Sequence, residues 1–210
     1  MTVTASDRTQ AVRRARQLNR LSISWNVIEA VVALGAGVVA GSVGLVAFGL
    51  DSVIEVSASV ILAWRLAQER HGACTQDADR HATRAIALCF GALALYVSVQ
   101  AVRDLAGRDR PAASAVGIVL AALSLVVMPV LAHMKAKLAP VLGSRAQQSE
   151  ANQTRLCAML SAVLLVGLVA NAALGWWWAD PVAALGIATI ALVEAQRTWR
   201  AESLEDTCCT

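Results

Sequence analysis

Residues 41–59 have the sequence GSVGLVAFGLDSVIEVSAS, an apolar stretch that contains two acidic residues, Asp51 and Glu55. The spacing of four residues places both carboxylates on one face of a helix. The apolar character continues through residues 43–65, which meets the requirement of about 20 residues for a helix that crosses a bilayer. Ionisable side chains within such a helix are costly and mark functional candidates. The segment therefore predicts a membrane-spanning helix that carries a polar site.

Five further apolar runs flank this stretch, and they lie roughly at residues 21–41, 84–103, 112–134, 151–175 and 178–199. Hydrophobic residues make up 57% of the 210-residue chain, whereas soluble domains are about 45–50% apolar. A soluble chain of this length could not bury so much apolar surface in one core. We therefore expect an all-α membrane protein with six transmembrane helices.

Lys and Arg are unevenly distributed between the two sides of these spans. Of the 18 Lys and Arg residues, all except Arg103, Arg108 and Arg110 fall on the side that holds both termini. Lys135 and Lys137, for example, fall in the connection between the fourth and fifth spans. The positive-inside rule then places both termini in the cytoplasm, and we expect a multi-pass protein of the cell (inner or plasma) membrane.

The expected organisation is one membrane domain with short ends. Residues 1–20 form a basic cytoplasmic segment, residues 21–199 the six-helix transmembrane domain, and residues 200–210 a short cytoplasmic tail. The tryptophans fit this topology: Trp25, Trp64 and Trp199 fall at cytoplasmic ends of spans, and residues 176–178 form an outer cluster. Tryptophan belts are typical of both membrane interfaces, although packing between helices is the alternative.

Several function classes are disfavoured by the sequence. The polar, Arg-rich start has no apolar core and predicts no signal peptide. The net charge of +3 is small, and no basic helix interleaves with aromatics, so no nucleic-acid partner is expected. The five cysteines form no CxxC pair, and a membrane thiol enzyme would need such a pair or a vicinal pair within the spans. We therefore expect no enzymatic activity and no cofactor.

A second candidate pair opens the fifth span, where residues 149–157 are SEANQTRLC. Gln153 and Cys157 are four residues apart, and Glu150 precedes them by almost a turn. Together with the two carboxylates of the second span, this pair supplies four oxygen and sulfur ligands, which suits a zinc-like ion. A buried cysteine also acts simply as a small hydrophobe. The carboxylates, for which we expect no intramembrane Lys or Arg as partner, could instead form a structural cluster with one carboxyl protonated.

Further polar residues have a less definite role. Asn26 and Glu29 on the first span either line an access path or bond to a neighbouring helix. The connection between the second and third spans holds metal-binding residue types that could present metal to the entrance or form a solvated loop: His71, Cys74, Asp77, Asp79 and His81. Cys208 and Cys209 in the tail could bind metal or be free thiols and give no indication of function.

These segments resemble the cation diffusion facilitator family of divalent-metal transporters. Residues 41–55, GSVGLVAFGLDSVIE, are similar to the family's pattern of Gly-Ser, an apolar run, and Asp or His followed four residues later by a carboxylate. Residues 167–195, GLVANAALGWWWADPVAALGIATIALVEA, resemble its connection between the fifth and sixth helices, including the Asp-Pro start of the sixth. The resemblance covers nearly all six spans and is to a short bacterial branch without the C-terminal cytoplasmic domain. A homodimer would then be built on the membrane helices.

The resemblance implies efflux of a divalent metal by alternating access, coupled to proton entry, with metal and protons as partners besides the lipid bilayer. It assigns the metal ligands to Asp51, Glu55, Gln153 and Cys157, and a possible access path to Asn26, Glu29 and Glu150. The usual fifth-helix pair is His or Asp followed by Asp, so Gln153 and Cys157 are a departure. A thiolate favours softer ions, so we expect zinc first, then cadmium, cobalt or iron, as the transported substrate. The alternative is a non-transporting membrane subunit or metal sensor that retains the fold and partners a true transporter.

Overall fold

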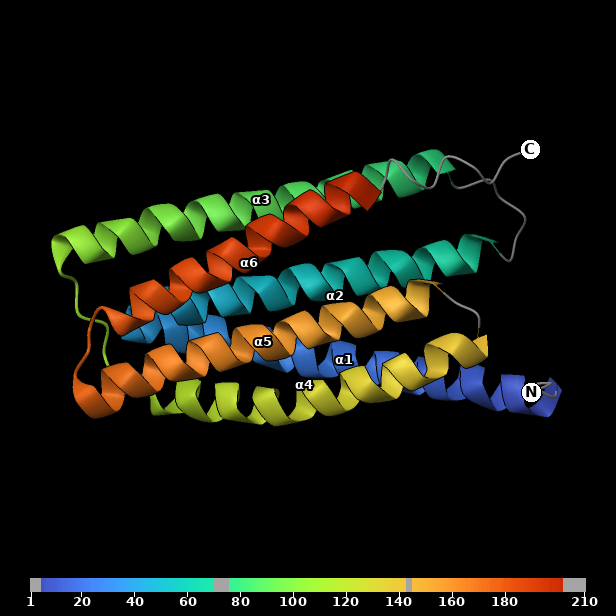
Figure 1. Cartoon of the computed structure of the whole chain (residues 1–210), viewed down its shortest axis with the longest axis horizontal. Coiled ribbons are helices and arrows are strands. Elements are labelled where there is room, and N and C mark those ends of the chain that lie inside the picture. The colour runs from blue at the N-terminus through green and yellow to red at the C-terminus, as the bar shows by residue number, and fades with distance from the viewer. Residues whose placement is uncertain (1–4, 70–75, 143–144, 202–210) are drawn as a thin grey trace.

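The computed structural model of the chain describes residues 5–69, 76–142 and 145–201, and these residues form six α-helices (Figure 1). Their bounds are α1 Ala5–Ala40, α2 Val43–Glu69, α3 Gln76–Gly107, α4 Ala115–Leu142, α5 Arg145–Leu174 and α6 Ala179–Ala201. Each helix contains a stretch long and apolar enough to cross a membrane. The expectation of an all-α protein with six spans is therefore confirmed.

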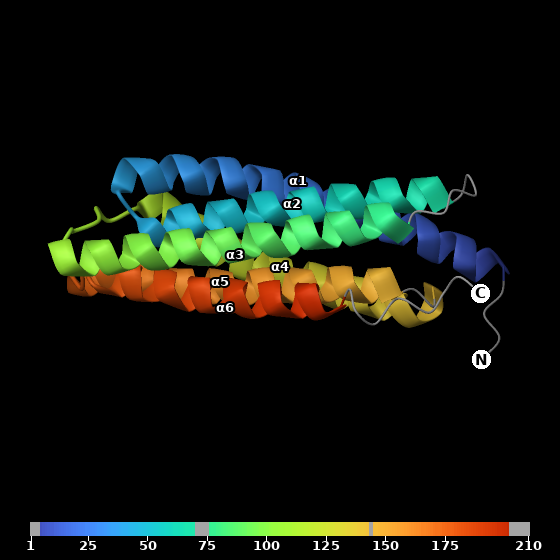
Figure 2. The same ribbon diagram turned by 90° about the horizontal axis from the view of Figure 1, so that it is seen from above.

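The six helices run nearly along one axis (Figures 1 and 2). The start of α1 and the end of α6 lie at the same end of the bundle, which we call the terminal end; the opposite end, where α1 meets α2, is the distal end. Helix α4 packs against α5 and α1, α1 packs against α2, and α3 pairs mainly with α6. Helix α6 also packs against α5 and α2, and α3 against α2, so that all six helices contribute side chains to one buried core.

The first helix begins earlier than the apolar pattern predicts. The expected first span starts near residue 21, but α1 starts at Ala5 and its candidate span is Gln10–Ala40. Arg, Gln and Ala are good helix formers, so the polar sequence before residue 21 does not end the helix. Trp25 consequently lies inside α1 rather than at its end. Its half-buried indole donates a hydrogen bond to Ser124 Oγ of α4 at 3.2 Å, so the packing alternative holds for this tryptophan.

The α1–α2 hairpin is tight because a glycine makes the turn and a carboxylate caps the second helix. Gly41 has φ +64°, a conformation that favours glycine. Ser42 Oγ accepts a hydrogen bond from Leu45 N at 3.1 Å and donates one to Asp180 Oδ1 at 2.7 Å. Asp180 Oδ2 also accepts from Gly44 N at 3.4 Å. The carboxylate at the start of α6 thus lies at the N-terminus of α2, where the helix dipole stabilises negative charge.

Part of the predicted polar inventory lies outside the described residues. His71, Cys74, Cys208 and Cys209 lie outside the described residues, as does most of the expected tail. The side chains of Trp64, Asp77, Asp79, His81 and Glu150 are also outside the described part of the structure.

Candidate metal site

Three of the four sequence-predicted ligands converge in the interior of the bundle. Asp51 and Glu55 of α2 and Cys157 of α5 each offer a ligand atom, and these atoms all lie within 4.8 Å of one another. All three side chains are buried, with exposed fractions of 3%, 3% and 1%. Two carboxylates and a thiol at this separation need only a small contraction to share one metal ion.

Asp51 of α2 and Cys157 of α5 lie at the same depth in the bundle because α5 extends past the start of α2 at the distal end, as Figure 1 shows. A Cβ atom added at Gly44 would lie 3.1 Å from Leu164 Cδ1, so Gly44 and Leu164 are level. Asp51 and Cys157 each lie seven residues, about 10 Å, from that level toward the terminal end. The distal extension of α5 is held by a hydrogen bond of 3.0 Å from Asn171 Nδ2 to Pro111 O.

Glu29 brings α1 into the same cluster. Its side chain is fully buried, and its Oε2 accepts hydrogen bonds from Ser52 Oγ at 3.3 Å and Cys157 Sγ at 3.7 Å. Its other oxygen accepts a hydrogen bond from Ser124 Oγ of α4. Glu29 therefore bonds to side chains of three neighbouring helices, as one of the two roles predicted from the sequence requires, and its place on an access path stays a prediction.

The cluster is rich in acidic side chains. Asp51 and Glu55 offer ligand atoms within 4.8 Å of each other and of the Cys157 thiol, and Glu29 contacts that thiol from α1. Two full charges about 4 Å apart repel by roughly 4 kcal/mol at an effective dielectric constant of 20. The arrangement is stable only when protons or a cation neutralise part of this charge, which is the property required of a site that binds and releases a cation.

Gln153 lies one turn of α5 from Cys157 but has a different environment. Its side chain is half-buried and lines a depression of about 320 Å³ at the α5–α6 surface, together with Glu194 and Arg197. Glu194 pairs there with Arg197 at 3.8 Å, and none of the residues that line this depression belongs to the cluster of Asp51, Glu55 and Cys157. The sequence did not single out Glu194, because it lies near the end of the sixth apolar run, where an acidic residue is ordinary.

The face of α1 between the terminal end and Glu29 is lined with buried oxygen atoms. Asn19 Oδ1, Ser22 Oγ and Asn26 Oδ1 are buried and have no hydrogen-bond partner. These residues are three or four apart and so share one face with Glu29. Buried polar atoms without partners are costly, so this row favours water or a cation along α1. Asn26 thus lies where an access path would run, whereas the side chain of Glu150 is not described.

Lys135 corrects the expectation that the spans hold no cation. The apolar pattern places it in the connection after the fourth span, yet α4 continues to Leu142 and its candidate span includes Lys135. The side chain is 1% exposed, and Nζ donates a hydrogen bond to Thr154 Oγ1 at 3.1 Å. Thr154 is one turn from Cys157 on the terminal side. The signal in the sequence was the face shared by Ser124, Met128, Leu131 and Lys135 at helical spacing.

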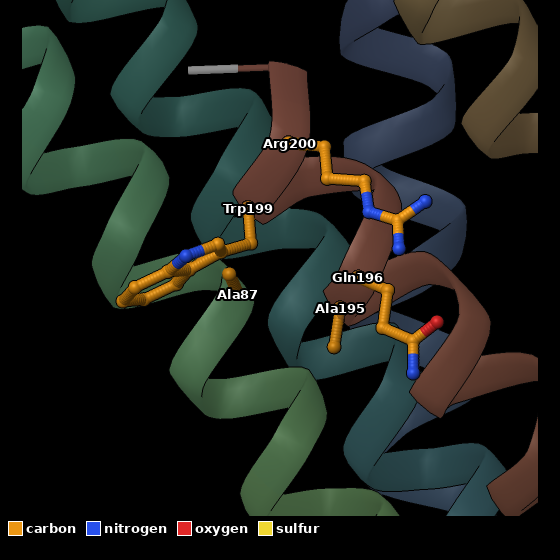
Figure 3. A pocket seen from close by; sticks show the side chains of 5 residues that line it. All are labelled: Ala87, Ala195, Gln196, Trp199 and Arg200. Carbon is orange, nitrogen blue, oxygen red and sulfur yellow. The ribbon is translucent and has the colours of Figure 1, made fainter. Parts of the chain in front are cut away.

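A second depression of about 230 Å³ lies between α3 and α6 (Figure 3). Its lining contains no acidic or thiol group and consists of Ala87, Ala195, Gln196, Trp199 and Arg200. The Arg84 guanidinium lies 5.7 Å from the centre of the Trp199 ring, a cation–π contact. Trp176 and Trp178 stack with ring centres 5.1 Å apart just before α6. Trp199 and the stacked pair therefore lie at opposite ends of α6, as expected for interface residues.

Comparison with known proteins assigns the chain to a family. A search of curated proteins gave no match. The family model described as the cation efflux transmembrane domain matches residues 20–204, which includes all six candidate spans except the first part of α1. The chain therefore belongs to the cation efflux family, in agreement with its resemblance to the cation diffusion facilitators, and is a multi-pass membrane transporter of cations.

Proposed function

We propose that the protein exports a divalent, zinc-like cation from the cytoplasm in exchange for protons. The observation that supports this proposal is the buried convergence of Asp51, Glu55 and Cys157, whose ligand atoms lie within 4.8 Å of one another. Carboxylate and thiolate are the two ligand types that zinc accepts besides imidazole. Their position inside the bundle suits an ion that passes through the membrane rather than one that stabilises the fold.

Cys157 supports the preference for a soft ion. Thiolates bind zinc and cadmium in preference to magnesium or calcium, so zinc is the proposed substrate, followed by cadmium, cobalt or iron. Binding also releases protons, because a cation that bonds to Sγ replaces the thiol proton and carboxylates bind metal only when deprotonated. The same groups can therefore hold a metal ion in one half of the cycle and protons in the other.

The proposed entrance is at the terminal end. The excess of Lys and Arg there favours a cytoplasmic location under the positive-inside rule, in the cell membrane. The unpartnered oxygen atoms of Asn19, Ser22 and Asn26 support a hydrated path along α1 that ends at Glu29. A reporter fused at either terminus is then expected in the cytoplasm, and one inserted near Arg108 is expected outside.

Metal uptake into sealed vesicles tests the proposal. The purified protein is reconstituted with a metal-sensitive dye inside, and zinc uptake is followed with and without an imposed pH gradient. We expect uptake by the unmodified protein, acceleration when the interior is acidic, and background uptake for Asp51→Ala. If the well-inserted protein takes up no zinc above background, the non-transporting subunit is favoured instead. If zinc uptake is the same with and without the pH gradient, proton exchange is removed from the proposal.

A further inference from the structure

We propose that Glu29 of α1 is a direct ligand of the transported cation and completes a site with Asp51, Glu55 and Cys157. This inference rests on the proposed function and changes its ligand set. The sequence assigned the fourth position to Gln153, on the same helix as Cys157. The structure instead places a carboxylate from a third helix within hydrogen-bond distance of the thiol.

The contact between Glu29 and Cys157 has the geometry of two ligands on one ion. Sγ of Cys157 lies 3.7 Å from Oε2 of Glu29. In a tetrahedral site with Zn–S of about 2.3 Å and Zn–O of about 2.0–2.2 Å, sulfur and oxygen are about 3.5 Å apart. A cation that displaces the thiol proton therefore finds both atoms already spaced for binding. The thiol proton is released to water, the S–H bond is replaced by a metal–sulfur bond, and no electron is transferred.

The surroundings of Glu29 are those of an oriented ligand. Ser52 and Ser124 both donate hydrogen bonds to its carboxylate, and Trp25 in turn donates to Ser124 at 3.2 Å. Such hydrogen bonds from outer residues fix the direction of a metal-binding side chain. A carboxylate has about four lone-pair positions, so these donors leave one oxygen available when the thiol proton is lost.

The environment of Gln153 points the same way. Its side chain is half-buried and lines the depression beside Glu194 and Arg197, whereas Glu29 is fully buried against Cys157. An amide oxygen is also a weaker partner for a divalent ion than a carboxylate, because it carries no net charge. The proposed site thus draws its ligands from α1, α2 and α5. A bound cation would therefore link α1 to α2 and α5.

Cadmium binding to the purified, full-length protein tests this ligand assignment. The background carries Ser at the four other cysteine positions, so that any thiolate–cadmium absorption band reports Cys157 alone. We expect Glu29→Gln to weaken cadmium binding by more than about 100-fold. A residue that only hydrogen-bonds to a metal ligand typically causes a loss of roughly 10–100-fold when it is replaced. Asp104→Asn is the matched control, because Asp104 is a buried acid on α3 outside the cluster, and it is expected to bind cadmium as the background does. Size-exclusion profile and helical circular dichroism establish that each variant is folded.

Glu29→His separates a ligand from a positioning residue. An imidazole at this position reaches the ion and restores binding, and X-ray absorption of the cadmium complex then shows one added imidazole. A loss below about tenfold in Glu29→Gln, or a Glu29→His complex without the imidazole signal, would overturn the proposal. If the background protein itself shows no thiolate–cadmium band, the proposed function fails; if it shows the band and Glu29→Gln binds equally well, only the role of Glu29 fails.

Discussion

Two buried carboxylate sites in this protein have opposite surroundings. Asp180 lies at the N-terminus of α2 and receives hydrogen bonds from Ser42 and Gly44. Asp51, farther along the same helix, lies beside the Glu55 carboxylate and the Cys157 thiol in the buried cluster. Hydrogen-bond donors satisfy the carboxylate of Asp180, so this side chain stabilises the fold. The neighbouring carboxylates of Asp51 and Glu55 repel each other when both are ionised, and protons or a cation must neutralise their charge. The first site therefore holds α2 to α6, and the second is arranged to bind an ion.

The largest effect is expected at Asp51. Asp51→Ala should reduce zinc uptake by more than about 100-fold, because even outer residues of a metal site change function by roughly 10–100-fold. Removing a repelling charge should leave insertion and folding intact. Uptake into vesicles measures the first effect, and membrane yield with size-exclusion profile measures the second. Normal uptake by this variant would show that the cluster does not carry the ion.

Cys157 is expected to set the choice of ion. Cys157→Ser should weaken cadmium binding by about 100-fold or more, at or above the upper limit for a residue that only supports a ligand, and zinc binding less, because a hydroxyl is a poor ligand for a soft ion. Cys157→Asp should retain zinc uptake, since a carboxylate still serves as a ligand. Competition between zinc and cadmium during uptake measures the ratio of cadmium to zinc transported. An unchanged ratio in Cys157→Ser would place sulfur outside the coordination of the ion.

Asp180 should behave as a stability residue. Asp180→Asn is expected to lower the free energy of unfolding by about 1–3 kcal/mol, because it weakens charged hydrogen bonds to Ser42 and the start of α2. Zinc uptake per folded molecule should remain close to that of the unmodified protein. Unfolding in detergent measures the change in the free energy of unfolding, and uptake into vesicles measures zinc transport per folded molecule. Loss of uptake without loss of stability would remove the contrast between the two carboxylate sites.

The smallest effect is expected at Gln153. Gln153→Ala should weaken cadmium binding by less than about tenfold, because the side chain lines the depression shared with Glu194 rather than the contact between Glu29 and Cys157. Isothermal titration with cadmium measures this change directly. A loss of cadmium affinity of more than about 100-fold would return Gln153 to the ligand set.

Apolar run length was sufficient to predict the six spans, and the spacing of Asp51 and Glu55 was sufficient to place them on one face. The ends of α1 and α4 were missed because polar residues such as Arg16 and Lys137 end an apolar run without ending a helix. Spacing within one helix also says nothing about its depth relative to another. Glu29 could therefore not be joined to Cys157 from the sequence, because their contact depends on how α1, α2 and α5 are staggered.

The central claim is that the transported cation bonds to Cys157 within the carboxylate cluster, and protection of this thiol from alkylation tests it most directly. Mass spectrometry of the detergent-solubilised protein follows the rate of modification at Cys157, with Cys89 on the outer surface of α3 as a reference in the same molecule. At a zinc concentration about 100 times the dissociation constant, modification of Cys157 should slow by about 100-fold, Cys89 should be unaffected, and Asp51→Ala should abolish the protection. Equal modification of Cys157 with and without zinc, in protein that transports zinc, would contradict the account.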